Sequence, residues 1–229
     1  MANSTQNEEF FTYYDERAPE YEAFYYGLFP AGQRRPDLYL NDRTGIASIL
    51  PSLLSGRCLD IACGTGFWLP YYHQNCSHVT LIDQSEKMLE ECRKKIDLAG
   101  IKYKTTLICH DIFSYKFPKA QFDCANAGFI ISHFNDDEMA NFFGVLKNTL
   151  VSDSVFTISD SVWSDFYRSI GMKKDGMAQR SLFDGRQFQV YKYFFEKEEV
   201  HNLGRRFGFE VEIKFWGEVF FLAAGRFTH

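Results

Sequence analysis

Glycines and a carboxylate occur together in the stretch Asp60–Gly66, directly after a short apolar run. Glycine lets the backbone turn sharply and lets a ligand approach the chain closely, so Gly64 and Gly66 predict a ligand-binding loop between a strand and a helix. A dinucleotide fingerprint would have a small residue at position 69, where this chain has Leu69. The carboxylate of Asp60 would repel a pyrophosphate but would attract the ammonium and sulfonium groups of S-adenosylmethionine.

Two further acids follow the next two apolar runs. Asp83 comes after the second run, where its carboxylate can accept hydrogen bonds from both hydroxyls of a ribose. Asp111 comes after the third run, in CHDIF, where it could hold an adenine amino group. A strand-end Asp is also a common turn former or helix cap, but three acids after three successive strands favour a nucleoside-binding site. Together with the glycine loop they predict S-adenosylmethionine as cofactor, and therefore a methyltransferase.

The elements that must position these residues alternate along the chain. We expect strands at Arg57–Ala62, His78–Ile82, Thr105–Cys109, Phe122–Ala127 and Ser154–Ser159, and helices at Gly66–Asn75, Ser85–Ala99 and Asp136–Leu150. This alternation predicts βαβ units and a parallel sheet, so the fold class is α/β and doubly wound. Two last strands, Phe209–Phe215 and Glu218–Ala224, meet at Gly217, and only an antiparallel pair can be joined so tightly.

With these motifs the sequence resembles class I (Rossmann-like) S-adenosylmethionine-dependent methyltransferases over roughly residues 40–160 and the last two strands. FDCANAGFIISHF, 122–134, is similar to their fourth-strand motif, and YYDERAPEYE resembles the N-terminal helix that closes over the cofactor in ubiquinone/menaquinone-type small-molecule methyltransferases. The resemblance implies a seven-stranded, mostly parallel sheet of order 3-2-1-4-5-7-6, with the last strand antiparallel and helices on both faces. The cofactor-binding residues it implies are Tyr14, Asp60, Ala62, Cys63, Gly64, Gly66, Asp83, Gln84, Met88, Asp111, Ile112 and Asn126.

Four regions are expected along the chain. Residues 1–36 would form a helical lid, 37–160 the cofactor-binding core, 161–193 an irregular substrate-side insertion, and 194–229 a helix and the antiparallel strand pair. Within them we predict a helix from Asn7 to about Phe24 that breaks at Pro19, a helix Asp37–Leu50 ended by Pro51, and a helix Lys197–Phe207.

His133 is the candidate catalytic residue, because it lies just past the fourth strand and its free pKa suits proton abstraction from a methyl acceptor. It could equally order the loop before the next helix. Tyr13, Tyr14 and Tyr21 could roof the site, or simply dock the first helix. Arg17 could pair with the cofactor carboxylate or be an exposed helix charge.

The acceptor is less defined by the sequence. Aromatic and Met side chains are dense in the insertion: Trp163, Phe166, Tyr167, Met172, Met177, Phe183, Phe188 and Tyr191. They predict a small apolar or aromatic acceptor methylated at O, N or C, or else a subdomain that packs on itself. A protein or RNA substrate is the alternative, disfavoured because 126–129 read NAGF and not the (D/N)PP(Y/F) tetrad of many amide- and base-amino-methylating enzymes. A non-catalytic cofactor-binding module is a third interpretation.

Composition excludes several other classes. The net charge is -5 and the basic pairs are scattered, so we expect no nucleic acid partner. No apolar run approaches the length of a membrane span, and the polar N-terminus is unlike a signal peptide. Six cysteines without a CxxC pair predict a reduced, cytoplasmic protein without a metal site. We expect a monomer or a homodimer.

Overall fold

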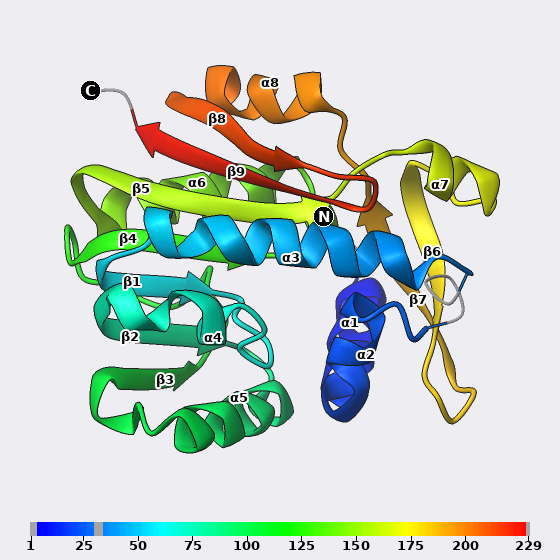
Figure 1. Cartoon of the computed structure of the whole chain (residues 1–229), viewed down its shortest axis with the longest axis horizontal. Coiled ribbons are helices and arrows are strands. Elements are labelled where there is room, and N and C mark those ends of the chain that lie inside the picture. The colour runs from blue at the N-terminus through cyan, green and yellow to red at the C-terminus, as the bar shows by residue number, and fades with distance from the viewer. Residues whose placement is uncertain (1–3, 30–33, 228–229) are drawn as a thin grey trace.

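A seven-stranded sheet forms the centre of the computed structural model, which describes residues 4–29 and 34–227. Its order is β3-β2-β1-β4-β5-β9-β8, and Figure 1 shows the strands stacked from β3 to β8. The bounds are β1 Gly56–Ile61, β2 Cys76–Asp83, β3 Thr105–Cys109, β4 Phe122–Gly128, β5 Leu150–Ser161, β8 Phe209–Trp216 and β9 Phe220–Phe227. The strands β1 to β5 are parallel, whereas β9 is antiparallel to both of its neighbours. The predicted fold class and strand order are confirmed.

Helices cover both faces of the sheet and enclose two cores. On one face lie α3 Pro36–Leu53, α4 Leu69–Tyr72 and α5 Glu86–Ala99, and on the other lie α6 Asp136–Thr149 and α8 Lys197–Phe207. Neighbouring residues of a strand serve different cores, as Cys58 and Leu59 do, because successive side chains of a strand point to opposite faces. Both cores are therefore built on the same strands.

Two predicted helix boundaries were wrong. Helix α3 continues past Pro51 to Leu53, because Leu50 and Leu54 on either side are fully buried and packing outweighs the one missing N–H. The helix predicted over Gly66–Asn75 is α-helical only from Leu69 to Tyr72, after the glycine turn, and ends as a 3-10 turn at Asn75.

The N-terminal segment comprises α1 Ser4–Arg17, a 3-10 turn Ala18–Glu20 and α2 Tyr21–Tyr25, so the break predicted at Pro19 is confirmed. These helices lie beyond the carboxyl ends of the parallel strands (Figure 1). Residues 1–3 and 30–33 of the predicted lid, and 228–229 at the other end, lie outside the described residues.

The insertion is not irregular, as its sequence had suggested. It contains α7 Asp165–Ser169 and an antiparallel pair, β6 Asp175–Ser181 and β7 Gln187–Tyr193. The pair packs against α1, where Glu9 Oε1 accepts a hydrogen bond from the Gln189 N–H at 2.7 Å. Arg180 of β6 and Lys192 of β7 occupy positions that face the protein interior. Because these inward positions are charged, the sequence lacks the alternation of apolar and polar residues by which strands are recognised.

The turn between β8 and β9 is fixed by a carboxylate from the opposite end of the chain. Asp42 of α3 is buried, and its Oδ2 accepts hydrogen bonds from the backbone N–H groups of Val219 at 2.7 Å and Phe220 at 2.9 Å. A Cβ at Gly217 would lie 2.1 Å from the Asp42 carboxyl group. Glycine is therefore needed here for close approach, which the sequence showed only as a tight joint.

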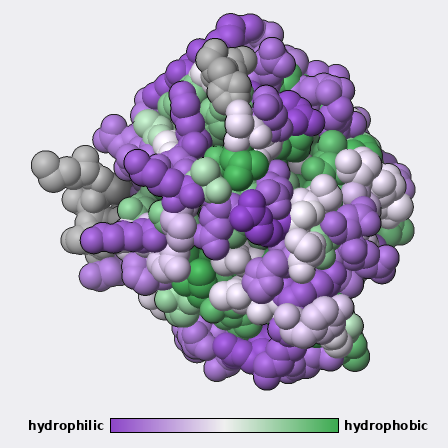
Figure 2. All heavy atoms as spheres, turned by 90° about the vertical axis from the view of Figure 1, so that its left-hand side faces the viewer, coloured by the Kyte–Doolittle hydropathy of each residue, from purple (hydrophilic) through white to green (hydrophobic). Residues whose placement is uncertain are grey.

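The surface at the amino ends of the parallel strands is mostly hydrophilic, and the hydrophobic residues visible there form separate small groups (Figure 2). Over residues 4–29 and 34–227, no helix combines the length and the apolar character that a membrane crossing requires. In the same part of the chain, no three His, Cys, Asp or Glu side chains are grouped as metal ligands would be.

Candidate active site

A cavity of about 700 Å³ lies at the carboxyl edge of the sheet, between the loops that follow β1 to β4 and the N-terminal helices. Open α/β sheets bind ligands at this edge, at the point where the strand order reverses, here between β1 and β4. The predicted site residues that line the cavity are Tyr14, Ala62, Gly64, Asp83, Gln84, Met88, Asp111, Ile112 and His133. The sequence thus predicted most of the cavity residues that follow the strands of the sheet.

The glycine loop has a backbone that favours glycine. Gly64, which lines the cavity, and Gly66 have positive φ angles of 54° and 68°, and Gly66 also allows close packing on α5, because a Cβ there would lie 2.7 Å from the Cys92 sulfur. Ala62 also has a positive φ, 50°, which is costly for a residue with a side chain and is typical of functional sites. At the end of β4, Phe129 adopts a φ of 62° and lines the same cavity.

Asp83 connects the loop to the second strand. Its Oδ2 accepts the Gly64 N–H at 2.8 Å and its Oδ1 accepts the Ser85 N–H at 2.9 Å. Burial raises the pKa of this carboxyl group above its ordinary value. Each oxygen has a further lone pair, so the carboxylate can accept hydrogen bonds from two vicinal hydroxyl groups in the cavity.

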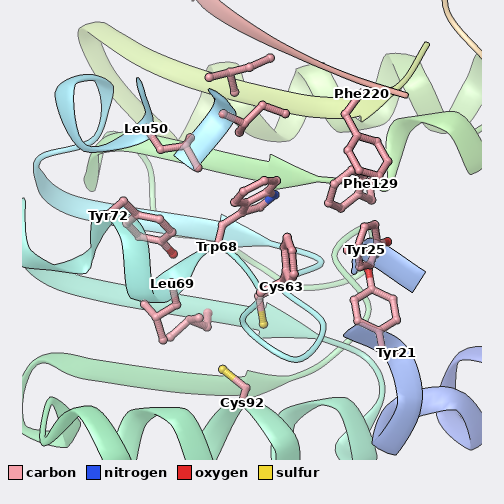
Figure 3. Close-up of a cluster of buried hydrophobic side chains, with 14 of the residues drawn as sticks. Tyr21, Tyr25, Leu50, Cys63, Trp68, Leu69, Tyr72, Cys92, Phe129 and Phe220 are labelled. Carbon is pink, nitrogen blue, oxygen red and sulfur yellow. Dashed lines mark hydrogen bonds between the residues drawn. The ribbon is translucent and has the colours of Figure 1, made fainter. Parts of the chain in front are cut away.

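Four predicted cofactor-binding residues do not line the cavity: Asp60, Cys63, Gly66 and Asn126. Asp60 lies opposite Asn126 in the pairing of β1 with β4, and it accepts hydrogen bonds from the Asn126 amide at 2.8 Å and from the Tyr72 hydroxyl at 2.5 Å. Burial raises the pKa of Asp60 to about 7. These side chains support the loop from behind, and Figure 3 shows the Cys63 sulfur turned toward Cys92 of α5.

The N-terminal helices roof the cavity. Tyr14 and Tyr21 line it, whereas Tyr13 points away and packs with Leu182 and Val190 on the strand pair β6–β7. Tyr25 of α2 stacks on Phe129 with ring centroids 4.2 Å apart, which ties the roof to the end of β4 (Figure 3). Both predicted functions of the tyrosines, roofing and docking, therefore occur, but in different residues.

His133 is half-buried between the roof and the strand pair. Its Nδ1 lies 2.6 Å from the Tyr191 carbonyl oxygen, which can only accept, so Nδ1 carries the proton. Nε2, 2.9 Å from the Tyr14 hydroxyl, is then the acceptor. Burial lowers the pKa of His133 well below its ordinary value, and the nearby Lys192 ammonium adds to this effect. The imidazole is neutral at neutral pH, and its basic nitrogen is occupied by Tyr14.

The sequence allowed Arg17 to be either an exposed helix charge or a partner of the cofactor carboxylate, and the first alternative is wrong. Arg17 is only 4% exposed and does not line the large cavity. Four further cavity residues, His110, Phe113, Phe129 and Ile130, belong to the segments recognised after the third and fourth strands, and Met177 and Tyr191 belong to the aromatic and Met cluster of the insertion. Glu138 and Gly176 also line the cavity and had no predicted role.

The cavity fits S-adenosylmethionine by size, polarity and charge. Its volume lies within the range of small-molecule sites, between about 300 and 1,000 Å³. Two carboxylates, Asp83 and Asp111, line it as hydrogen-bond acceptors, and Met88 and Ile112 add apolar surface. Aromatic rings on the roof suit a sulfonium ion.

Comparison with known proteins agrees with this site. Residues 58–153 match the model of a family described as a methyltransferase domain. A phosphatidylethanolamine N-methyltransferase of Cereibacter sphaeroides is 36% identical over 77 residues, which are 34% of this chain and 37% of that protein. The chain thus aligns with little more than a third of that relative's length.

Solved structures show the same fold over the whole chain. A complex of DhpI with SAH has a TM-score of 0.77 at 21% identity and covers 98% of both chains. Phosphoethanolamine N-methyltransferase 1 of Haemonchus contortus, in complex with phosphoethanolamine and S-adenosylhomocysteine, has a TM-score of 0.69 at 16% identity and covers 100% of this chain and 50% of that one. Residues 58–153 therefore match a methyltransferase domain, and the chain as a whole has the Rossmann-like fold of these solved methyltransferases.

Proposed function

We propose that this chain, a class I S-adenosylmethionine-dependent methyltransferase, methylates a small molecule held between its N-terminal helices and the strand pair β6–β7. The observation that carries the proposal is the roof: α1, α2 and β7 close the cavity on the side where an acceptor must enter. A polymer substrate would need an open groove at this position. Of the two methyltransferases described above whose names include an acceptor, one is named for phosphatidylethanolamine, a lipid, and the other for phosphoethanolamine, a small polar molecule. The second is in keeping with the proposal.

The cofactor, when bound, supplies a methyl group on a positively charged sulfur. The chain contributes placement and the exclusion of water, which are most of what methyl transfer requires. Asp83 and Asp111 would hold the adenosyl part from the strand ends. The aromatic roof would keep water from the reacting atoms while the acceptor is held in line.

His133 and Tyr14 would receive the acceptor's proton as a pair. Because Tyr14 donates to His133 Nε2, the acceptor's O–H or N–H proton would pass to the Tyr14 oxygen as the Tyr14 proton moves to Nε2. The acceptor then carries the new bond to carbon, and His133 carries the proton until it is released to solvent. Burial raises the pKa of Tyr14, so the hydroxyl is protonated before the reaction, as this relay requires.

Transfer of labelled methyl groups to metabolite pools, followed by assays of His133→Ala and Tyr14→Phe with the acceptor found, tests the proposal. We expect turnover to fall by about 100-fold in each variant, the usual contribution of a general base, while the affinity for S-adenosylhomocysteine changes little. Full turnover in His133→Ala would contradict the role of His133. Thermal stabilisation by NAD but not by S-adenosylmethionine would contradict the cofactor and the activity.

A further inference from the structure

A second, smaller cavity lies directly behind the Tyr14–His133 pair. Its volume is about 30 Å³, room for about two water molecules. Tyr14, Phe129 and His133 line both cavities and form the wall between them. The remaining lining residues come from α1 and α2, from the segment after β5, and from β6 and β7. A molecule occupying the small cavity would therefore touch the proposed proton-accepting pair from the side opposite the glycine loop.

Arg17 enters this cavity without a counter-charge. Its guanidinium donates to the Tyr13 hydroxyl at 2.7 Å and, more weakly, to the Tyr21 carbonyl oxygen at 3.4 Å. It also lies over four aromatic rings, at 5.1 to 5.4 Å from their centroids. The Nε–H is buried without a hydrogen-bond partner, and no carboxylate of the described residues lies within ion-pair distance of this side chain.

Two further cations line the same cavity from the strand pair. Lys192, 6% exposed, pairs with the buried Asp160 at 3.0 Å and donates to the Ser132 hydroxyl at 2.5 Å. Arg180, which is half-buried, makes no ion pair or hydrogen bond with any residue in 4–29 or 34–227, and its nearest aromatic contact is the Phe24 ring at 6.0 Å. Three cations thus face the cavity and one carboxylate compensates them, which leaves two positive charges.

Such an arrangement is costly for the fold alone. Buried charges are normally paired, because moving an unpaired charge out of water costs several kcal/mol. The three cations also repel one another: burial lowers the pKa of Lys192, Asp160 raises it, and Arg180 and Arg17 lower it again. The hydroxyl groups of Ser161 and Tyr167, which also line the cavity, are further donors. Donors from four chain segments therefore line one small cavity.

We propose that this cavity binds a dianionic phosphoryl or phosphonate group of the methyl acceptor, with Arg17, Arg180 and Lys192 as its ligands. The inference rests on the proposed function, since it assigns the acceptor's chemical class. A tetrahedral dianion matches both the two uncompensated charges and the donors arriving from several directions. The cavity must widen to admit it, and Arg180 is the least buried of the three cations. The group to be methylated then faces Tyr14 and the large cavity. The apolar or aromatic acceptor expected from the insertion is replaced by this proposal.

The carboxylate of the cofactor is the competing occupant. It would bring one negative charge to a cavity in which two positive charges have no carboxylate partner among the described residues. The two occupants make opposite predictions for cofactor binding, because only the cofactor's own carboxylate would make Arg180 a cofactor ligand.

Calorimetric titration of the full chain, saturated with S-adenosylhomocysteine at pH 7.5, tests the proposal with small probes. Methylphosphonate and inorganic phosphate are the dianions, dimethyl phosphate represents the phosphodiester of a lipid headgroup, and acetate represents a carboxylate. The variants are Arg180→Met and Arg17→Met, and the control is Arg205→Met, which removes an exposed arginine of α8 that pairs with Glu198.

We expect methylphosphonate to bind the wild type and Arg205→Met alike, and to bind Arg180→Met about 10- to 100-fold more weakly, as loss of a charge-assisted hydrogen bond implies. Dimethyl phosphate and acetate should bind at least about tenfold more weakly than methylphosphonate to the wild type. Equal affinity for diester and dianion, or equal affinity of Arg180→Met and Arg205→Met, would overturn the proposal. A loss of S-adenosylhomocysteine affinity in Arg180→Met that matches the loss for methylphosphonate would assign the cations to the cofactor instead. These readouts need no turnover, so they stand apart from failure of the methyltransferase activity itself.

Discussion

Two buried polar centres of this protein lie close to the same strand ends and are built in opposite ways. Under the turn between β8 and β9, the Asp42 carboxylate is matched by the N–H groups of Val219 and Phe220. In the small cavity, Arg17 and Arg180 have no carboxylate partner among the residues in view. A satisfied centre stabilises the fold, whereas an unsatisfied one costs stability and is kept where a ligand completes it. The contrast separates groups that stabilise the structure from groups that we propose bind a substrate.

Substitution of Lys192 should have the largest effect on stability, because this residue both pairs with a buried carboxylate and lines the small cavity. Lys192→Met would leave Asp160, which is fully buried, without its cation. Breaking a buried pair from one side costs about 3–5 kcal/mol of unfolding free energy. Urea unfolding without ligand measures this loss, and a loss below about 1 kcal/mol would show that Asp160 needs no cation, in conflict with the charge count of the cavity.

Asp42 tests the satisfied centre. Asp42→Ala would leave two buried N–H groups without an acceptor, and we expect a loss of about 2–4 kcal/mol, since each unsatisfied group costs about 1–3 kcal/mol. Asp42→Asn keeps one acceptor oxygen and is the matched control, with a smaller loss expected. Affinity for S-adenosylhomocysteine should be unchanged in both folded variants. If the two variants lose equal stability, the accepted hydrogen bonds are not what Asp42 contributes.

Asp60 is a third buried carboxylate, and its contribution depends on pH. Its pKa is raised to about 7 in the folded protein, above the ordinary value, so the stability it contributes is complete only at low pH and is lost as the pH rises through 7. Asp60→Asn does not titrate. The unfolding free energy of Asp60→Asn minus that of the wild type should therefore increase by about 2–3 kcal/mol from pH 5 to pH 8. Chemical unfolding at the two pH values gives the difference, and a flat difference would place the pKa of Asp60 in the folded protein below pH 5.

Arg180 gives the smallest expected effect and the sharpest contrast with Lys192. Arg180→Met removes a cation that has no hydrogen-bond or ion-pair partner within residues 4–29 and 34–227 and that is repelled by Lys192. We expect the ligand-free protein to be unchanged or more stable by up to about 1 kcal/mol. Thermal unfolding beside Lys192→Met measures it. A clear destabilisation by Arg180→Met would mean that this arginine serves the fold and not a ligand.

The sequence alone predicted the parallel sheet and the wall of the large cavity that the sheet provides, whereas the strand order was implied by the family resemblance. It could do so because the glycine loop, Asp83 and Asp111 each follow an apolar strand directly, and parallel strands bring their carboxyl ends to one edge. Local spacing was sufficient, since every one of these residues is positioned by the strand that precedes it. The break at Pro19 was predictable for the same reason: a proline acts on its own backbone.

Tertiary structure decided what lies on the other side of the site. Strands β6 and β7 are recognisable only once α1 packs against them, because charged residues occupy inward positions 180 and 192. The environment of His133 depends on Tyr14 and on the Tyr191 carbonyl, which are 119 and 58 residues away in the chain. Arg17, Arg180 and Lys192 come from three elements, and nothing in their spacing shows that they meet. The sequence determines which side chains follow each strand directly. Only the tertiary structure brings together charged residues from separate segments, because no local sequence pattern places them side by side.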